Sequence, residues 1–140
     1  MKINLIVGEK GSGKTKKLTE LINQRVIYSN GSVVCIEKGD VSTFTVSHKV
    51  RLIDADDCKV RGVDQLYGLI AGVLESNYDI TDIFIDATFR IIGEKDINLL
   101  LELLKKIKEN LNYDAELTFT VSCSPLLLTP DILERIAKVL

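Results

Sequence analysis

A segment near the start of the chain carries a pattern of residue types that can bind phosphate. Residues 8–15 read Gly-Glu-Lys-Gly-Ser-Gly-Lys-Thr, which fits the pattern G-x-x-x-x-G-K-[ST] without a mismatch. Glycine lets the backbone adopt positive φ and approach an anion closely, so that successive N–H groups can converge on phosphate oxygens. The lysine of this pattern reaches the β- and γ-phosphates, and its last hydroxyl binds Mg²⁺. The segment therefore predicts a site for a nucleoside triphosphate with Mg²⁺.

Each residue of the segment receives an expected role. Lys14 is expected to place its ammonium between β- and γ-phosphate oxygens and so to act in catalysis. Thr15 is expected to give its hydroxyl to Mg²⁺. The other residues expected to contact the nucleotide, mainly through backbone N–H groups, are Gly8, Lys10, Gly11, Ser12, Gly13 and Lys16.

A second run of residues, further along the chain, can supply a carboxylate to the same ion. The apolar residues 83–85 are followed at once by Asp86. A buried strand that ends in an acid can deliver that acid close to Mg²⁺, usually through a bound water. We therefore predict Asp86 as the metal-side acid, together with Thr15.

The pattern of apolar residues predicts the elements that position these candidates. The apolar residues 3–7 predict a buried strand before the glycine-rich segment, and residues 16–29 repeat apolar side chains at helical spacing after it. Further strands are expected at 33–36, 50–53, 83–86 and 117–122, and further helices at 64–76, 96–110 and from 129 to the last residue.

This alternation predicts an α/β fold of three layers, with a mostly parallel sheet of about five strands between two layers of helices. Residues 43–47 alternate between apolar and polar, so they are expected to form a small β-hairpin with residues 50–53, around His48.

Bulk properties restrict the class of protein. The 140 residues suit one domain, residues 1–140. The formal net charge of −2 gives no basic field that would indicate a nucleic-acid surface. No apolar run approaches the roughly 18 residues of a membrane span. A cleaved leader would remove the glycine-rich segment, so we expect none, and we expect the protein in the cytoplasm.

The remaining reactive side chains receive no role in this interpretation. Cys35, Cys58 and Cys123 lie far apart in the sequence, and no pair has the spacing of metal ligands. His48 is the only histidine, and no metal-binding or nucleophilic partner stands near it in the sequence.

On these motifs the chain resembles the P-loop NTPases. The glycine-rich segment with its flanking strand and helix, and the strand that ends at Asp86, carry the resemblance. The order of elements is similar to that of the recombinase-like ATPase core, and in part to that of type II thymidine kinases. The resemblance implies a P-loop NTPase fold that binds ATP and Mg²⁺, and it places Ser122 where such ATPases carry a polar sensor of the γ-phosphate.

The chain departs from this family at several positions. Ala87 follows Asp86, where many of these ATPases carry the catalytic glutamate. The recombinase-like ATPases instead use a glutamate at the end of the strand beside the loop strand, so the resemblance implies Glu37 as the water-orienting base if residues 33–36 form that neighbour. The zinc-binding cysteines of the thymidine kinases are absent. Arg90 is the only arginine close to Asp86, and we expect it to form a surface ion pair.

The sequence leaves three functions open. One is an Mg²⁺-dependent ATPase, slow by itself and activated by a protein partner or by a second copy of the chain, because neither a clear base nor an arginine finger is evident. Another is a nucleotide-binding switch module without catalysis. The third is a small nucleoside or metabolite kinase. ATP is expected as the nucleotide because the guanine-reading motif N-K-x-D is absent.

Overall fold

A parallel β-sheet forms the centre of the molecule. The computed structural model describes residues 1–39, 46–129 and 136–140. In these residues six strands form one sheet in the order β3-β2-β4-β5-β1-β6, and every neighbouring pair is parallel. The strands are β1 (Lys2–Gly8), β2 (Ser32–Glu37), β3 (Arg51–Asp54), β4 (Ile80–Ile85), β5 (Glu116–Ser122) and β6 (Lys138–Val139).

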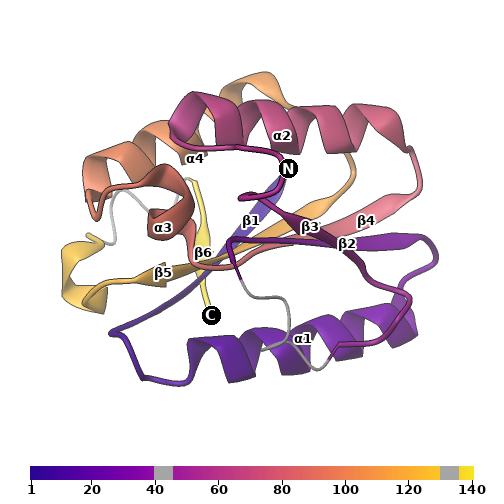
Figure 1. The fold of residues 1–140 in the computed structure, drawn as a ribbon, viewed down its shortest axis with the longest axis horizontal. Helices are drawn as coiled ribbons and strands as arrows, with labels where there is room; N and C mark the ends of the chain where they lie inside the picture. Colours follow the sequence, from indigo (N-terminus) through magenta and orange to yellow (C-terminus); the bar gives the residue numbers. More distant parts are fainter. Residues whose placement is uncertain (40–45, 130–135) are drawn as a thin grey trace.

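Helices cover both faces of this sheet (Figure 1). Helix α1 (Lys14–Tyr28) lies on one face. Helices α2 (Val63–Ser76), α3 (Thr88–Ile92) and α4 (Ile97–Asn110) lie on the other. Parallel strands need such crossover connections, because the chain must run back to the end of the sheet where the strands begin before it can form the next strand. The described residues therefore form the three layers that the alternating pattern predicts, and the α/β class is confirmed.

Each face of the sheet has its own core. Side chains such as Ile36, Ile85 and Phe119 pack against the α2–α4 layer, whereas Cys35 and Phe84 pack against α1. Successive side chains of a strand point to opposite faces. Strands buried on both faces need apolar residues at consecutive positions, which explains the continuous apolar runs in the sequence.

The prediction of a β-hairpin around His48 is wrong for the described residues. Its first strand falls on residues 43–47, of which 43–45 lie outside the described ranges, while Val46 and Ser47 are not in a strand. The second strand exists as β3, but it pairs in parallel with β2, with Cys35 opposite Leu52. Strand β3 therefore forms the edge of the sheet, where it pairs with the side of β2 that β4 leaves open.

The prediction of a C-terminal helix is also wrong at its end. Residues 130–135 lie outside the described ranges, so most of this helix is not tested. Lys138 and Val139 form β6 beside β1, and the N–H group of Leu140 donates to the carbonyl of Leu5 at 2.8 Å. The extended chain gives the other edge of β1 backbone partners that a helix could not give. None of the helices in the described part of the chain is long and apolar enough to cross a membrane.

Candidate functional site

A cavity of about 990 Å³ opens at the carboxyl ends of the central strands. Its walls come from the segment of residues 8–15, here called the glycine-rich loop, from the first turn of α1, and from the ends of β4 and β5. In open parallel sheets this is the edge where ligands bind. Most of the predicted site residues lie together here: Lys10, Gly11, Gly13, Lys14, Thr15, Lys16 and Asp86 all line the cavity.

The backbone of the glycine-rich loop has the conformation that its glycines allow. Gly11 and Gly13 have φ of 84° and 89°, in the left-handed region that disfavours other residues. At Gly8 a Cβ would lie only 2.3 Å from Ser12 Oγ, so the Ser12 side chain would have to move. The turn of the loop depends on glycine at Gly11 and Gly13, where φ is positive.

The start of α1 presents positive potential to the cavity. Gly13 is the N-cap of α1, no side chain caps the helix, and no acidic residue lies in its first turn. The first N–H groups of a helix have no partner within the helix, and the helix dipole adds partial positive charge there. Lys14 Nζ folds back and donates to the carbonyl of Glu9 at 2.9 Å. The loop can therefore receive an anion without first displacing a capping carboxylate.

Asp86 is held in place by the neighbouring strand β5. The hydroxyl of Thr120 donates to Asp86 Oδ1 at 2.6 Å and accepts from the N–H group of Ala87 at 2.8 Å. Ala87 has a φ of 53°, a left-handed conformation that costs free energy in a residue other than glycine and is common at functional sites. One hydroxyl thus positions both the carboxylate and the turn behind it.

Sequence reasoning missed Thr120, although a signal was present. Thr118, Thr120 and Ser122 alternate along β5, which places all three on one face of the sheet. Ser122, expected near a γ-phosphate, lines the cavity and pairs in register with Gly8 of the loop strand.

The strand order contradicts the premise on which Glu37 was selected. Strand β2 pairs with β3 and β4, while the loop strand β1 pairs with β5 and β6. Glu37 therefore does not end the strand beside the loop strand, and it is not among the described residues that line the cavity. The connection from β1 to β2 passes over the positions of β5 and β4. The apolar pattern of the sequence does not indicate how many strand positions a connection crosses.

Glu37 nevertheless lies close to Asp86. Ile36 pairs with Ile85, so the next residue of each strand, Glu37 and Asp86, stand level at the ends of neighbouring strands. Glu37 is buried, at 3% exposure. Burial raises the pKa of the Cys35 thiol well above its ordinary value, and the carboxylates of Glu37 and Asp86 raise it further. The catalytic role of Glu37 stays a prediction.

The cavity is strongly basic. Its lining includes two acids, Asp86 and Glu94, and seven cationic side chains: Lys10, Lys14, Lys16, Lys38, Arg61, Arg90 and Lys95. Four of the seven lie outside the glycine-rich loop and the first turn of α1, in separate segments that no sequence motif connects. Arg90 was expected to form a surface ion pair, but it lines the cavity and the described residues give it no such pair.

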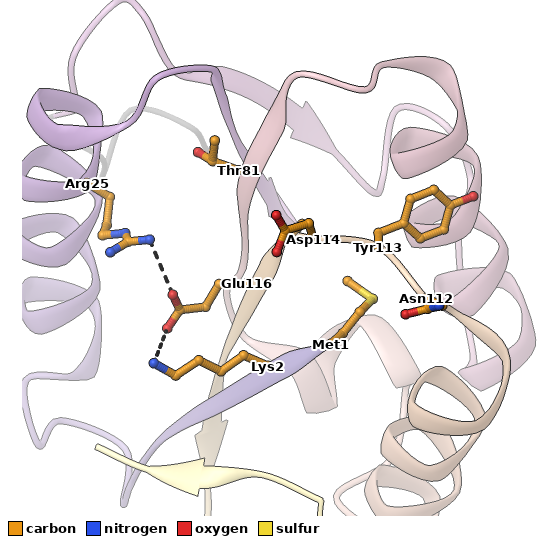
Figure 2. A pocket seen from close by; sticks show the side chains of 9 residues that line it. Met1, Lys2, Arg25, Thr81, Asn112, Tyr113, Asp114 and Glu116 are labelled. Carbon is orange, nitrogen blue, oxygen red and sulfur yellow. Dashed lines mark hydrogen bonds and ion pairs between the residues drawn. The ribbon is translucent and has the colours of Figure 1, made fainter.

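A second cavity, of about 670 Å³, lies at the opposite ends of the strands (Figure 2). Three of its charged side chains, Lys2, Arg25 and Glu116, form ion pairs with one another. Arg25 contacts Glu116 at 3.2 Å and Asp82 at 3.0 Å, and Lys2 lies 3.6 Å from Glu116. Because both cationic side chains of this lining already have acidic partners, the basic cavity is the better candidate for an anionic ligand.

A scan against known protein families finds no match to this chain, and a search of curated proteins finds none either. The assignment of a function therefore depends on the residues and geometry of the basic cavity.

Proposed function

We propose that the protein binds ATP with Mg²⁺ in the basic cavity, as a P-loop NTPase similar to the recombinase-like ATPases. The observation that carries this proposal is the shared position of the motif residues and the acid. Lys14 and Thr15 line the same cavity as Asp86, although the two parts of the chain are far apart in sequence. A match to the motif by chance would give no reason for an acid at the end of an apolar strand to lie beside it.

The proposed contacts follow from the residue types. The loop N–H groups, Lys14 and the N-terminus of α1 take the β- and γ-phosphates. Magnesium prefers oxygen ligands and keeps several waters, so the hydroxyl of Thr15 and the carboxylate of Asp86 suit it. The described ranges hold no group of three or more His, Cys, Asp or Glu that could bind a metal without the help of a ligand, so the phosphates themselves would have to supply part of the coordination. When bound, the ion would neutralise charge on the phosphates.

Hydrolysis is proposed to be slow without a protein partner or a second copy of the chain. A water-orienting base is needed for phosphoryl transfer to water, and Glu37 stands beside Asp86 but does not line the cavity. The same observation favours a second candidate function, a switch that binds ATP without hydrolysing it. Both candidates place the protein with ATP in the cytoplasm.

Thermal unfolding with and without ligand tests the binding. We expect ATP with Mg²⁺ to raise the melting temperature, ATP without Mg²⁺ to raise it less, and Lys14→Ala to abolish both shifts. Lys2→Ala is the matched control, because Lys2 lies in the opposite cavity. GTP and ADP in the same screen report the specificity. Equal shifts in wild type and Lys14→Ala would show that ATP binds elsewhere and would overturn the proposal.

Phosphate release separates the two candidates. With protein in excess over labelled ATP, a slow ATPase releases phosphate in one turnover, and Glu37→Gln should stop that release while binding continues. A switch module binds ATP equally well and releases none.

A further inference from the structure

Three of the cations in the basic cavity gather around helix α3, outside the glycine-rich loop itself. Lys38 Nζ donates to the carbonyl of Arg90 at 3.3 Å. A Cβ at Gly93, where α3 ends, would lie 3.9 Å from Arg61 Cγ, so the Arg61 side chain passes over the end of the helix. All three side chains line the cavity. They form a basic wall, defined here as Lys38, Arg61 and Arg90.

The charges of the basic wall are poorly balanced by the described protein. Arg61 and Arg90 have no ion pair within the described ranges, and Lys38 has only Asp56, 3.8 Å away and half exposed. Like charges held together in a concave site repel one another and attract anions. This arrangement favours an anionic ligand in contact with the wall.

ATP does not account for the basic wall. The proposed nucleotide already meets Lys10, Lys14 and Lys16 and the uncapped start of α1, and Mg²⁺ removes part of its charge. The cavity of about 990 Å³ lies at the upper end of the range of about 300–1,000 Å³ that encloses a drug-sized ligand. Positive charge is therefore left over for a second, smaller molecule in this large cavity.

We propose that Lys38, Arg61 and Arg90 form a binding site for a small phosphorylated molecule, occupied beside the nucleotide. The inference rests on the proposed function, because it assigns the loop side of the cavity to ATP. Guanidinium groups suit phosphate oxygens, which they contact through two parallel hydrogen bonds. The concave location favours a small phosphomonoester over an extended nucleic-acid strand, which needs an open basic groove.

Calorimetric titration with glycerol 3-phosphate tests the site. The protein is first saturated with Mg²⁺ and a non-hydrolysable ATP analogue, and glycerol serves as the uncharged control ligand. We expect glycerol 3-phosphate to bind and glycerol not to bind. Each lost guanidinium contact should weaken binding about tenfold, so Arg61→Gln with Arg90→Gln should weaken it about a hundredfold. Arg51→Gln, an exposed arginine of β3, should leave it unchanged.

Affinity for the ATP analogue, measured on the same proteins, separates this proposal from the proposed function. We expect the double variant to bind the analogue within about twofold of wild type, with circular dichroism confirming its fold. Lys14→Ala should lose the analogue but still bind glycerol 3-phosphate. The proposal is overturned if wild type with analogue takes up no glycerol 3-phosphate, or if the double variant binds it as wild type does. A loss of analogue affinity in the double variant would instead assign the arginines to the γ-phosphate.

Discussion

The two ends of the central strands use charge in opposite ways. At the amino ends, Arg25 pairs with the buried Asp82 and with Glu116, and Glu116 also accepts from Asn4. At the carboxyl ends, the basic cavity combines many cations with few acids. Strand β4 connects the two ends, since Asp82 lies near its start and Asp86 follows its last residue, Ile85.

This difference indicates which charges serve stability and which serve a ligand. A buried charge destabilises the protein unless it is paired, and Asp82 at 2% exposure has its partner. Cations without partners repel one another in the free protein, and an anion relieves that repulsion. We therefore expect substitutions at the amino ends to lower the free energy of unfolding and those at the carboxyl ends to lower ligand affinity.

The largest difference should appear between Arg25→Ala and Arg61→Ala in denaturant unfolding. Arg25→Ala leaves the buried Asp82 unpaired, and because Arg25 itself is partly exposed we expect a loss of about 2–3 kcal/mol. Arg61→Ala breaks no ion pair in the described ranges, so its unfolding free energy should stay within about 0.5 kcal/mol of wild type. Equal losses in the two variants would contradict the comparison.

Asp82 within β4 and Asp86 just after it give the next test. Asp82→Asn removes the charge that Arg25 meets, so it should lower stability by about 2 kcal/mol and leave ATP binding intact. Asp86→Asn keeps an oxygen that can accept from Thr120, so stability should change less. It should remove the effect of Mg²⁺ on ATP affinity, about tenfold for one charged contact. Calorimetry with and without Mg²⁺ measures this, and an unchanged Mg²⁺ effect in Asp86→Asn would contradict the predicted metal site.

Thr120 and Thr118 of β5 test the same comparison through the loss of a single hydroxyl group. Thr120→Val leaves the N–H group of Ala87 without its acceptor and frees Asp86, so we expect a loss of about 1–2 kcal/mol together with a weaker Mg²⁺ effect. Among the described residues, Thr118 accepts one long hydrogen bond, from Asn4 at 3.4 Å, so Thr118→Val should cost about 0.5 kcal/mol. Unfolding curves with and without Mg²⁺-ATP measure the stability of each variant and its gain from the ligand. Equal stability and equal gain in Thr120→Val and Thr118→Val would show that Thr120 has no role in the site.

The smallest expected effect is a difference in the alkylation of the cysteine thiols, one of which lies near the carboxylates of Glu37 and Asp86. Burial and the charges of Glu37 and Asp86 raise the pKa of Cys35, and burial raises that of Cys123. Because the thiolate is the reactive form, both should resist alkylation of the native protein even as the pH approaches 9, while the exposed Cys58 reacts. Mass spectrometry should find one label per chain, on Cys58. Rapid labelling of Cys35 would contradict the burial of its thiol in the native protein.

Much of the candidate site was predictable because local patterns specify it. The glycine-rich loop can be read from residues 8–15, since glycine positions and a following amphipathic helix determine a turn within a few residues. Asp86 was predictable because a continuous apolar run marks a buried strand and its next residue must leave the sheet. Thr120 could also have been predicted, from its alternation with Thr118 and Ser122. Glu37 was selected on a strand order that the structure contradicts.

The sequence by itself determined the three-layer α/β architecture, the turn of the glycine-rich loop and the strand that delivers Asp86, because these depend on periodicity and on residues close in the chain. Only the tertiary structure decided the order of the strands, the pairing of β3 and β6 at the edges, and the gathering of Lys38, Arg61 and Arg90 around α3. Those features depend on contacts between segments far apart in sequence, whose free energies no local pattern records.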